Sequence, residues 1–204
     1  MASSDLVHVV DDDVDVRKSL GFLLGTADFA VRLHESATAF LSMSTSSLDG
    51  CIVTDVRMPG IDGIEFLRQL RTRGHTLPVI VMTGHADVAL AVQAMKEGAS
   101  DFIEKPFDDE MLIDAIRSAL ANRNQAPAAH PQSAEINGRL STLSERERQV
   151  LDGLVSGLPN KTIAYDLGIS PRTVEIHRAN VMSKMQASSL SHLVRMALIV
   201  ESRP

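Results

Sequence analysis

Short apolar runs alternate with amphipathic segments through the first 122 residues. The runs are residues 6–10, 30–33, 51–54, 79–82 and 101–103, and the helical segments are residues 14–26, 37–42, 63–73, 87–97 and 108–122. Nearly continuous apolar strands joined by helices indicate a five-stranded parallel sheet covered on both faces. Right-handed crossovers make a doubly wound α/β sandwich the expected fold, and function then gathers at the carboxyl ends of the strands.

The rest of the chain has a different character. Residues 122–138 contain two prolines and many small residues, which is typical of a linker. Residues 140–200 show no strand pattern and predict about four helices. We therefore expect an α/β domain over residues 1–123, a linker over 124–139 and an all-α four-helix domain over 140–204.

Charge is divided along the same boundary. Residues 1–123 carry 19 acids and 11 Lys/Arg (net −8), whereas residues 124–204 carry 7 acids and 9 Lys/Arg (net +2), which together give the chain's −6. The two parts are thus expected to meet different partners. No run of about 18 uncharged apolar residues is present, and Cys51 is the single cysteine, so we expect a cytoplasmic protein without a membrane partner or internal disulfide.

Three consecutive carboxylates follow the first apolar run. Two like charges about 5 Å apart repel by roughly 3 kcal/mol at an effective dielectric near 20, so Asp11, Asp12 and Asp13 require compensation. Asp55 follows the third run, and neighbouring strands would bring it to the same cleft as Asp11 and Asp12. A Mg²⁺ ion with oxygen ligands would offset the repulsion. Alternatively, Asp12 or Asp13 caps the following helix and complements its dipole, a role that we expect of Asp13 and Asp15.

Two later strand ends favour the metal site. Thr83 follows the fourth run, and Lys105 follows the fifth. An ammonium supplies a point charge for a phosphoryl oxygen, and a hydroxyl can donate to another. Asp55 is then the expected nucleophile, because an aspartate can carry a covalent phosphoryl group in a displacement that needs mainly positioning.

Residues 158–185 show the signals of a helix-turn-helix. Asn160 and Ser170 are expected helix caps, Gly168 permits a left-handed residue, and Pro171 suits a first helical position. Val174, Val181 and Met185 recur at helical spacing and should face the core. The outward face would enter the major groove of duplex DNA, and 3% aromatic residues argue against stacking on single strands.

The strand-end residues resemble the signature of response-regulator receiver domains. The motifs that carry this likeness are Val10-Asp11-Asp12, Thr54-Asp55-Val56-Arg57-Met58-Pro59-Gly60, Thr83-Gly84 and Glu104-Lys105-Pro106. The resemblance implies that Asp55 accepts phosphate from a sensor histidine kinase. It also implies Mg²⁺ held by Asp12, Asp55 and the main-chain carbonyl of Arg57, with Asp11 assisting through water.

The same resemblance assigns a switch and a backbone feature. Thr83 and Phe102 would form the switch pair, in which the threonine moves toward the phosphoryl group and an aromatic ring turns inward. The Lys105-Pro106 bond is usually cis in that family.

Residues 140–200 resemble the LuxR-type DNA-binding domain, and the two domains together define the NarL/FixJ family. The run 101–107 and the run 158–167 resemble its nitrogen-fixation regulators, which implies a FixL-like kinase. The expected DNA-contacting residues are Arg172, Thr173, Glu175, Ile176, His177, Arg178 and Lys184.

The resemblance also implies a homodimer on phosphorylation. Apolar positions near Val88, Val92 and Met95 could form one dimer surface, and Leu190, Leu193, Val194 and Ala197 could pair two DNA-binding domains. For both sets the alternative is burial within one domain.

We therefore interpret the chain as a phosphorylation-switched transcription factor rather than an enzyme, with double-stranded promoter DNA as partner and activation of nitrogen-fixation genes as the expected output. RNA polymerase is a further candidate partner. One rival is a Mg²⁺-dependent phosphohydrolase using the same acids; another is a constitutive DNA-binding protein whose α/β domain is only a scaffold.

Overall fold

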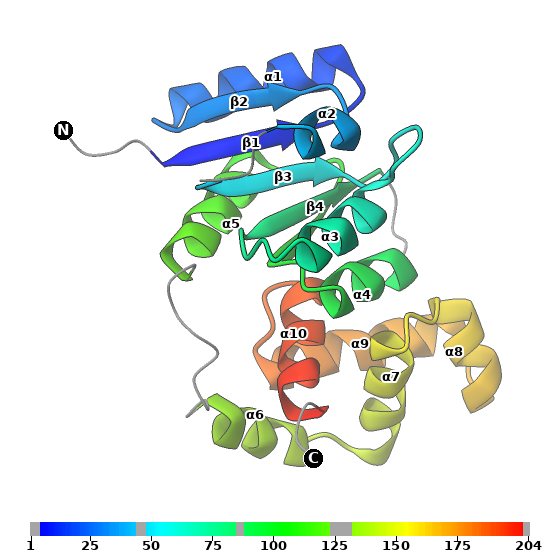
Figure 1. The fold of residues 1–204 in the computed structure, drawn as a ribbon. Coiled ribbons are helices and arrows are strands. Elements are labelled where there is room, and N and C mark those ends of the chain that lie inside the picture. Colours follow the sequence, from blue (N-terminus) through cyan, green and yellow to red (C-terminus); the bar gives the residue numbers. More distant parts are fainter. Residues whose placement is uncertain (1–4, 44–47, 85–87, 123–131, 202–204) are drawn as a thin grey trace. The chain divides into compact units, whose positions relative to one another are not determined.

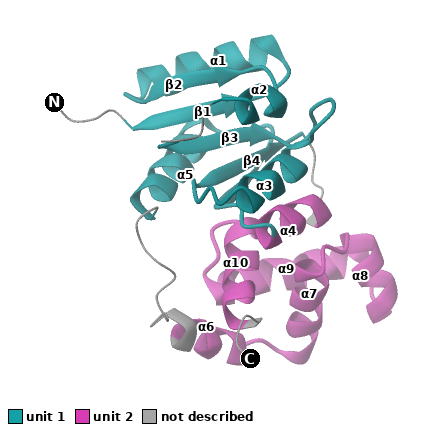
Figure 2. Cartoon of the chain, viewed as in Figure 1, with its two compact units in different colours: residues 1–86, 97–126 teal, residues 87–96, 127–204 magenta. Residues whose placement is uncertain are grey.

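The computed structural model describes residues 5–43, 48–84, 88–122 and 132–201 (Figure 1). The chain divides into two compact units (Figure 2). The first comprises residues 1–86 and 97–126, and the second comprises residues 87–96 and 127–204. Within the described ranges, no helix combines the length and the apolar character needed to cross a bilayer.

A parallel sheet forms the centre of the first unit, as predicted. Its strands are β1 (Leu6–Val10), β2 (Ala30–His34), β3 (Cys51–Asp55), β4 (Val79–Thr83) and β5 (Asp101–Glu104). They lie in the order β2-β1-β3-β4-β5, with every neighbouring pair parallel. Each strand after β1 ends one residue later than its apolar run, because a polar last residue still pairs through its backbone. Two of these last residues are Asp55 and Thr83.

Helices cover both faces of the sheet. They are α1 (Val14–Thr26), α2 (Ala37–Leu41), α3 (Gly63–Thr72) and α5 (Asp109–Asn122). Leu20 and Leu24 of α1 and Leu112 and Ile116 of α5 share one core with β-strand residues that include Cys51. Burial raises the pKa of the Cys51 thiol to about 12.

An aromatic cluster fills the opposite face. Phe40 of α2 makes edge contacts with His8 of β1, with His34 of β2 and with Phe66 of α3. The two imidazoles stack, and Nδ1 of His8 lies 3.0 Å from Nε2 of His34. Burial lowers the pKa of both histidines, that of His34 to about 4, so the pair is a neutral core element at physiological pH.

The second unit is helical. It contains α4 (Val88–Lys96), α6 (Gln132–Ser141), α7 (Glu145–Val155), α8 (Asn160–Leu167), α9 (Pro171–Met185) and α10 (Leu190–Glu201). The four helices predicted from residue 140 onward are α7 to α10. Val150, Leu154, Val174, Val181 and Met185 are among the residues of their common core.

Helix α6 lies where the sequence predicts a linker. Ile136 is buried in the core of the second unit, and Arg139 pairs with Glu135 one turn away at 2.6 Å. A second nitrogen of Arg139 donates to the main-chain oxygen of Met185 at 2.9 Å. Ile136, the partly buried Leu140 and Arg139 thus attach to the second unit a segment whose composition is typical of a linker, and the domain boundaries stay a prediction.

Most residues of the two candidate dimer surfaces are buried, and Leu190 is half-buried. Val92 and Met95 of α4 are 3% and 6% exposed, and Leu193, Val194 and Ala197 of α10 are also buried. Within the second unit α4 packs beside α10, so these apolar residues have partners in the chain itself. The side chain of Val88 lies outside the described residues.

Candidate functional site

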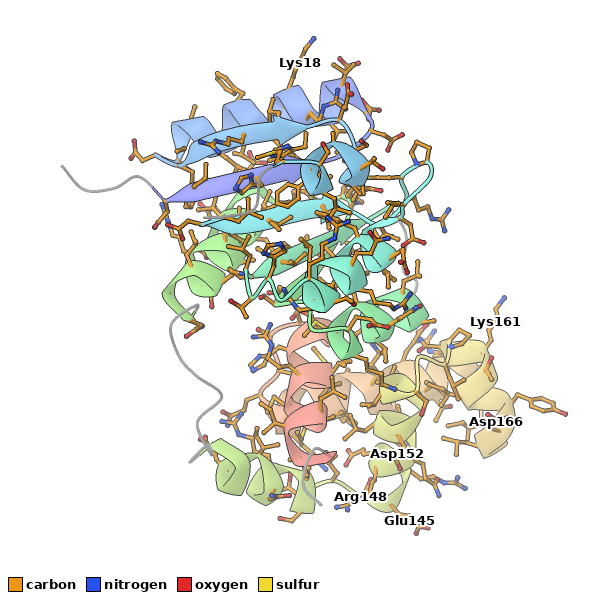
Figure 3. All side chains as sticks on the ribbon, in the orientation of Figure 1. Lys18, Glu145, Arg148, Asp152, Lys161 and Asp166 are labelled. Carbon is orange, nitrogen blue, oxygen red and sulfur yellow. The ribbon has the colours of Figure 1, made fainter. Side chains whose placement is uncertain are left out.

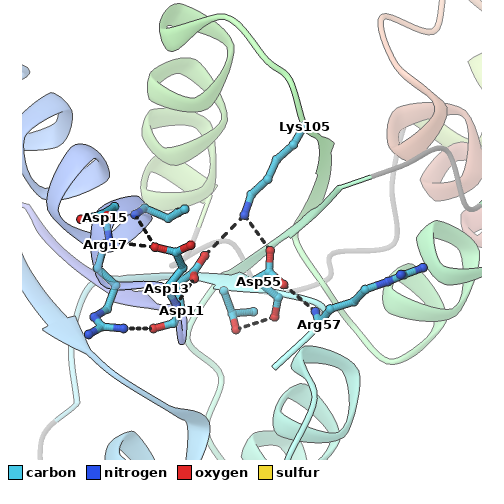
Figure 4. Close-up of polar contacts among 9 residues, drawn as sticks. Asp11, Asp13, Asp15, Arg17, Asp55, Arg57 and Lys105 are labelled. Carbon is cyan, nitrogen blue, oxygen red and sulfur yellow. Dashed lines mark hydrogen bonds and ion pairs between the residues drawn. The ribbon is translucent and has the colours of Figure 1, made fainter. Parts of the chain in front are cut away.

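Asp55 ends β3 with its carboxylate held by two donors. Its Oδ1 accepts a hydrogen bond from Nζ of Lys105 at 2.7 Å, and its Oδ2 accepts one from the main-chain N–H of Arg57 at 2.6 Å (Figure 4). The Asp55 side chain is 12% exposed. The carboxylate is therefore fixed in direction while still reachable from solvent, which suits a nucleophile in a displacement that depends on positioning.

Lys105 joins this carboxylate to a second one. Its Nζ also lies 3.4 Å from Oδ2 of Asp11, the residue that follows β1. The lysine follows β5, and its main-chain N–H donates to the carbonyl oxygen of Thr83 at 2.6 Å. The Lys105-Pro106 bond is cis, as the resemblance implies. Residues from four strand ends thus meet, as the parallel sheet predicts.

The charges in this cluster are unbalanced. One ammonium faces two carboxylates, and Asp11 is 2% exposed. Burial raises the pKa of the Asp11 carboxyl, although the N–H of Asp13 and the charge of Lys105 oppose that rise. Burial also disfavours the charge of Lys105, but the hydrogen bond and charge of Asp55, with those of Asp11, raise its pKa overall. Further positive charge would stabilise the cluster.

The predicted metal ligands offer oxygen donors of the kind that Mg²⁺ prefers. Asp12 is exposed and lies directly beside the cluster in sequence. In the described ranges, no three Asp, Glu, His or Cys side chains gather closely enough to hold a metal by themselves. Mg²⁺ typically takes only one or two carboxylates and keeps several waters. Asp12, Asp55 and the Arg57 carbonyl fit that donor chemistry, and the ligand set stays a prediction.

The predicted switch residues lie on one face of the sheet. Thr83 is 1% exposed at the end of β4. In the β4–β5 register Val81 pairs with Phe102 and Thr83 pairs with Glu104, so Thr83 and Phe102 are diagonal neighbours. Phe102 is only half-buried. A half-buried aromatic ring and a hydroxyl near the acidic cluster are thus adjacent, although their role as a switch stays a prediction.

Two residues that support this cluster do not stand out in the sequence. Gly63 begins α3 so close to β3 that a Cβ there would lie 2.2 Å from the main-chain oxygen of Asp55. Arg17 of α1 donates from Nη1 to the main-chain oxygen of Asp11 at 2.6 Å. A carbonyl contact leaves no motif, and the only available signal is the position of Arg17 one turn into the helix that follows the acids.

Helices α8 and α9 form the predicted helix-turn-helix. Ser170 caps α9 by accepting from the N–H of Thr173 at 3.1 Å, and Gly168 ends α8 with φ 65°. Asn160 does not cap α8: the cap position is Pro159, and Oδ1 of Asn160 has no hydrogen-bond partner within the described part of the chain. Figure 3 shows Lys161 and Asp166 pointing outward from α8, and Tyr165 between them is 87% exposed.

The predicted DNA-contacting residues fall into three groups. Arg172, Glu175 and Ile176 are exposed, with Ile176 at 56%, and Arg178 and His177 are half-buried. The hydroxyl of Thr173 lies 2.8 Å from that of Ser170, within the cap. The outward face of α9 therefore presents a large exposed apolar side chain, Ile176, flanked by charges.

Lys184 is engaged elsewhere. Its Nζ lies 2.7 Å from Oε2 of Glu147 and 3.3 Å from the main-chain oxygen of Thr142. Glu147 is 4% exposed and completes a capping box with Ser144 at the start of α7. The Lys184 hydrogen bond, with the Ser144 N–H, lowers the pKa of Glu147 to about 2. Lys184 thus ties α9 to α7.

Two protein-family models match the chain, one in each of its two parts. The family model for response regulator receiver domains matches residues 7–117, and the model for bacterial regulatory proteins of the luxR family matches residues 141–197. The chain belongs to the NarL/FixJ family of response regulators. In this family the receiver implies a histidine kinase partner and the luxR-type domain implies DNA binding. Receiver domains generally bind Mg²⁺ at their acidic site.

Relatives match along nearly the whole chain. The transcriptional regulatory protein FixJ of Azorhizobium caulinodans is 57% identical over 204 residues, covering 100% of this chain and 97% of that protein. FixJ of Rhizobium meliloti is 58% identical over 192 residues, covering 94% of each. The crystal structure of full-length FixJ from B. japonicum is 48% identical with a TM-score of 0.58, covering 100% of both chains.

These findings choose between the functions left open by the sequence. The chain is a FixJ-like two-component response regulator and a regulator of transcription. The relatives are named as regulators rather than enzymes, and the phosphohydrolase alternative is not supported.

Proposed function

We propose that Asp55 is the phosphoacceptor. The observation that carries this proposal is the contact of the Lys105 ammonium with Asp55 at 2.7 Å and with Asp11 at 3.4 Å. An oxygen of Asp55 attacks the phosphorus of the kinase phosphohistidine, the N–P bond breaks, and the phosphoryl group leaves the histidine for an acyl phosphate. Lys105 then pairs with a phosphoryl oxygen, as its position beside Oδ1 allows.

Asp12, Asp55 and the main-chain carbonyl of Arg57 are the proposed holders of Mg²⁺, with Asp11 assisting through water. Bound Mg²⁺ supplies charge neutralisation for the phosphoryl oxygens. The excess of carboxylates over cations near Lys105 supports this assignment, because it leaves the cluster short of positive charge.

Thr83 and Phe102 are the proposed switch pair. The new phosphoryl group offers acceptor oxygens near the end of β4, and the Thr83 hydroxyl turns to donate to one of them. Phe102, its half-buried diagonal neighbour, then gains room to turn inward. A change of charge at Asp55 becomes a change of surface near β4 and β5.

The outward face of α9 is the proposed DNA-reading surface, with Arg172, Thr173, Glu175, Ile176, His177 and Arg178 in or beside the major groove. Arg side chains can read guanine, and the exposed Ile176 can contact a thymine methyl group. Lys184 was also expected here, but its ion pair with buried Glu147 favours a role in holding α9 against α7.

The expected output is activation of nitrogen-fixation genes in the cytoplasm, by a homodimer that forms on phosphorylation and acts with RNA polymerase. The naming of the relatives as FixJ regulators supports the choice of genes, and the receiver domain supports a histidine kinase as the phosphodonor. To move the population from 1:99 to 99:1, phosphorylation must favour the active state by about 5.5 kcal/mol.

One experiment tests the proposal. The full chain is incubated with Mg²⁺ and a small acyl phosphate donor, and mass, oligomeric size and affinity for duplex promoter DNA are measured on the same sample. We expect the mass of one phosphoryl group, a dimer and tighter DNA binding, and no labelling of Asp55→Asn. Stoichiometric labelling of Asp55→Asn would refute the acceptor assignment, and equal DNA affinity with and without donor would favour the constitutive rival.

A further inference from the structure

The peptide bond between Asp11 and Asp12 joins two of the residues that contribute carboxylates to the acidic cluster. Three groups of Asp11 make contacts with residues outside α1. Its N–H donates to the carbonyl oxygen of His34 at 3.3 Å, and its Oδ1 accepts from the N–H of Asp13 at 2.9 Å. Its Oδ2 faces Nζ of Lys105. The remaining group is the carbonyl oxygen. Its orientation sets the plane of the peptide and therefore the direction in which Asp12 leaves the chain.

Arg17 holds that carbonyl oxygen. Its Nη1 donates to it at 2.6 Å, and Figure 4 shows the guanidinium reaching from α1 to the base of the cluster. The reach depends on how α1 begins, because Asp13 caps the helix by accepting from the N–H groups of Asp15 and Val16 at 2.8 and 3.2 Å. Arg17 thus links α1 to the loop that carries the acids.

Arg17 makes its contact at the main-chain oxygen of Asp11 rather than at the Asp11 or Asp55 carboxylate. The guanidinium stays clear of the Asp55 carboxylate, whose two oxygens accept from Lys105 and Arg57. Its effect on Asp55 must therefore be indirect.

We infer that Arg17 is a positioning residue of the phosphorylation site: by fixing the Asp11-Asp12 peptide, it sets the affinity of the acidic cluster for Mg²⁺. This inference rests on the proposed function. Groups that orient metal ligands without touching the metal typically contribute about 10- to 100-fold in metal affinity. A role confined to holding α1 on the sheet would instead affect stability and leave the affinity for Mg²⁺ unchanged.

The test compares Arg17→Ala and Arg17→Lys with Lys18→Ala in the full chain. Lys18 is the neighbouring cation and points away from the molecule (Figure 3), so its removal controls for the loss of one positive charge from α1. Mg²⁺ binding is measured by calorimetry without phosphodonor, labelling by an acyl phosphate is measured across Mg²⁺ concentrations, and a thermal melt reports folding.

For Arg17→Ala we expect about tenfold weaker Mg²⁺ binding and an equal rise in the half-saturating Mg²⁺ for labelling, with a near wild-type rate at saturating Mg²⁺ and an unchanged melt. Arg17→Lys should lie between this variant and the wild type, and it keeps the test available should Arg17→Ala fold poorly. If Arg17→Ala and Lys18→Ala bind Mg²⁺ equally well, the inference is wrong. A wild-type chain that neither binds Mg²⁺ nor becomes labelled would instead refute the proposed function.

Discussion

Each unit of the chain contains a lysine 2.7 Å from a carboxylate oxygen, Lys105 with Asp55 and Lys184 with Glu147. The surroundings differ. Lys105 is shared with a second buried acid, whereas Glu147 has one ammonium to itself and accepts the Ser144 N–H as well. Burial raises the pKa of the Asp11 carboxyl, whereas the Lys184 hydrogen bond lowers that of Glu147 to about 2. Of these two short ion pairs, the one whose charges do not balance lies at the proposed phosphorylation site.

The largest expected effect is on the rate of Asp55 phosphorylation, which should depend on Lys105 but not on Lys184. Lys105→Ala should slow labelling of Asp55 by about 100-fold, because a phosphoryl oxygen loses its cation. Lys184→Ala should label at the wild-type rate. The rates are followed by mass spectrometry at saturating Mg²⁺. Equal slowing of both variants would mean that loss of a lysine, rather than its place in the acidic cluster, is responsible.

The next effect is on the free energy of unfolding, which should depend more on Glu147 than on Asp11. Glu147→Gln should lower the free energy of unfolding by about 2 kcal/mol, because the capping box and the Lys184 pair are lost. Asp11→Asn should cost less or stabilise the chain, since it removes a buried charge whose cation, Lys105, is shared with Asp55. Urea unfolding followed by circular dichroism measures both, and a larger loss for Asp11→Asn would overturn the contrast in charge balance.

A smaller effect concerns the cations of α9. Arg178→Ala should reduce discrimination between the operator and a mutated site by about 1 to 2 kcal/mol if the guanidinium reads a base. Lys184→Ala should leave that discrimination intact, because its ammonium is committed to Glu147. Binding to the two duplexes is compared at one salt concentration. Loss of discrimination in Lys184→Ala alone would return Lys184 to the DNA-reading surface.

The smallest expected effect is the loss, at low pH, of the stability that Glu147 contributes. Its pKa is lowered from 4.5 to about 2 on folding, so the unfolded chain takes up the proton first as the pH falls. The stabilisation is therefore fully present above pH 4.5 and is lost as the pH approaches 2. The stability difference between wild type and Glu147→Gln should shrink over that interval, and an unchanged difference would contradict the low pKa.

The sequence predicts the strands and the strand-end residues because each depends on a local pattern. Apolar runs define β1 to β5, and a parallel sheet necessarily brings their carboxyl ends together, so Asp11, Asp55, Thr83 and Lys105 could be grouped without coordinates. The caps Asp13 and Ser170 are predicted for the same reason, since a cap and its helix are adjacent in the chain.

What escaped prediction depends on contacts between distant segments. The apolar residues of α4 and α10 have the composition of an exposed dimer surface but are buried. Lys184 has the spacing of a DNA-facing residue, and only the position of Glu147, 37 residues earlier, reveals its partner. Arg17 donates to a main-chain oxygen, which every residue has, so the residue types in the sequence do not indicate that contact.

Cys51 and Tyr165 are the single cysteine and the single tyrosine of a chain without tryptophan, and they lie in different units. Since Cys51 is buried at 0% exposure in β3, a thiol reagent can react with it only when the sheet opens. Tyrosine emission comes from α8 alone. The rate of Cys51 labelling thus reports the opening of the first unit, and tyrosine fluorescence reports the environment of α8 in the second. Both can be followed in one sample without introducing a probe by mutation.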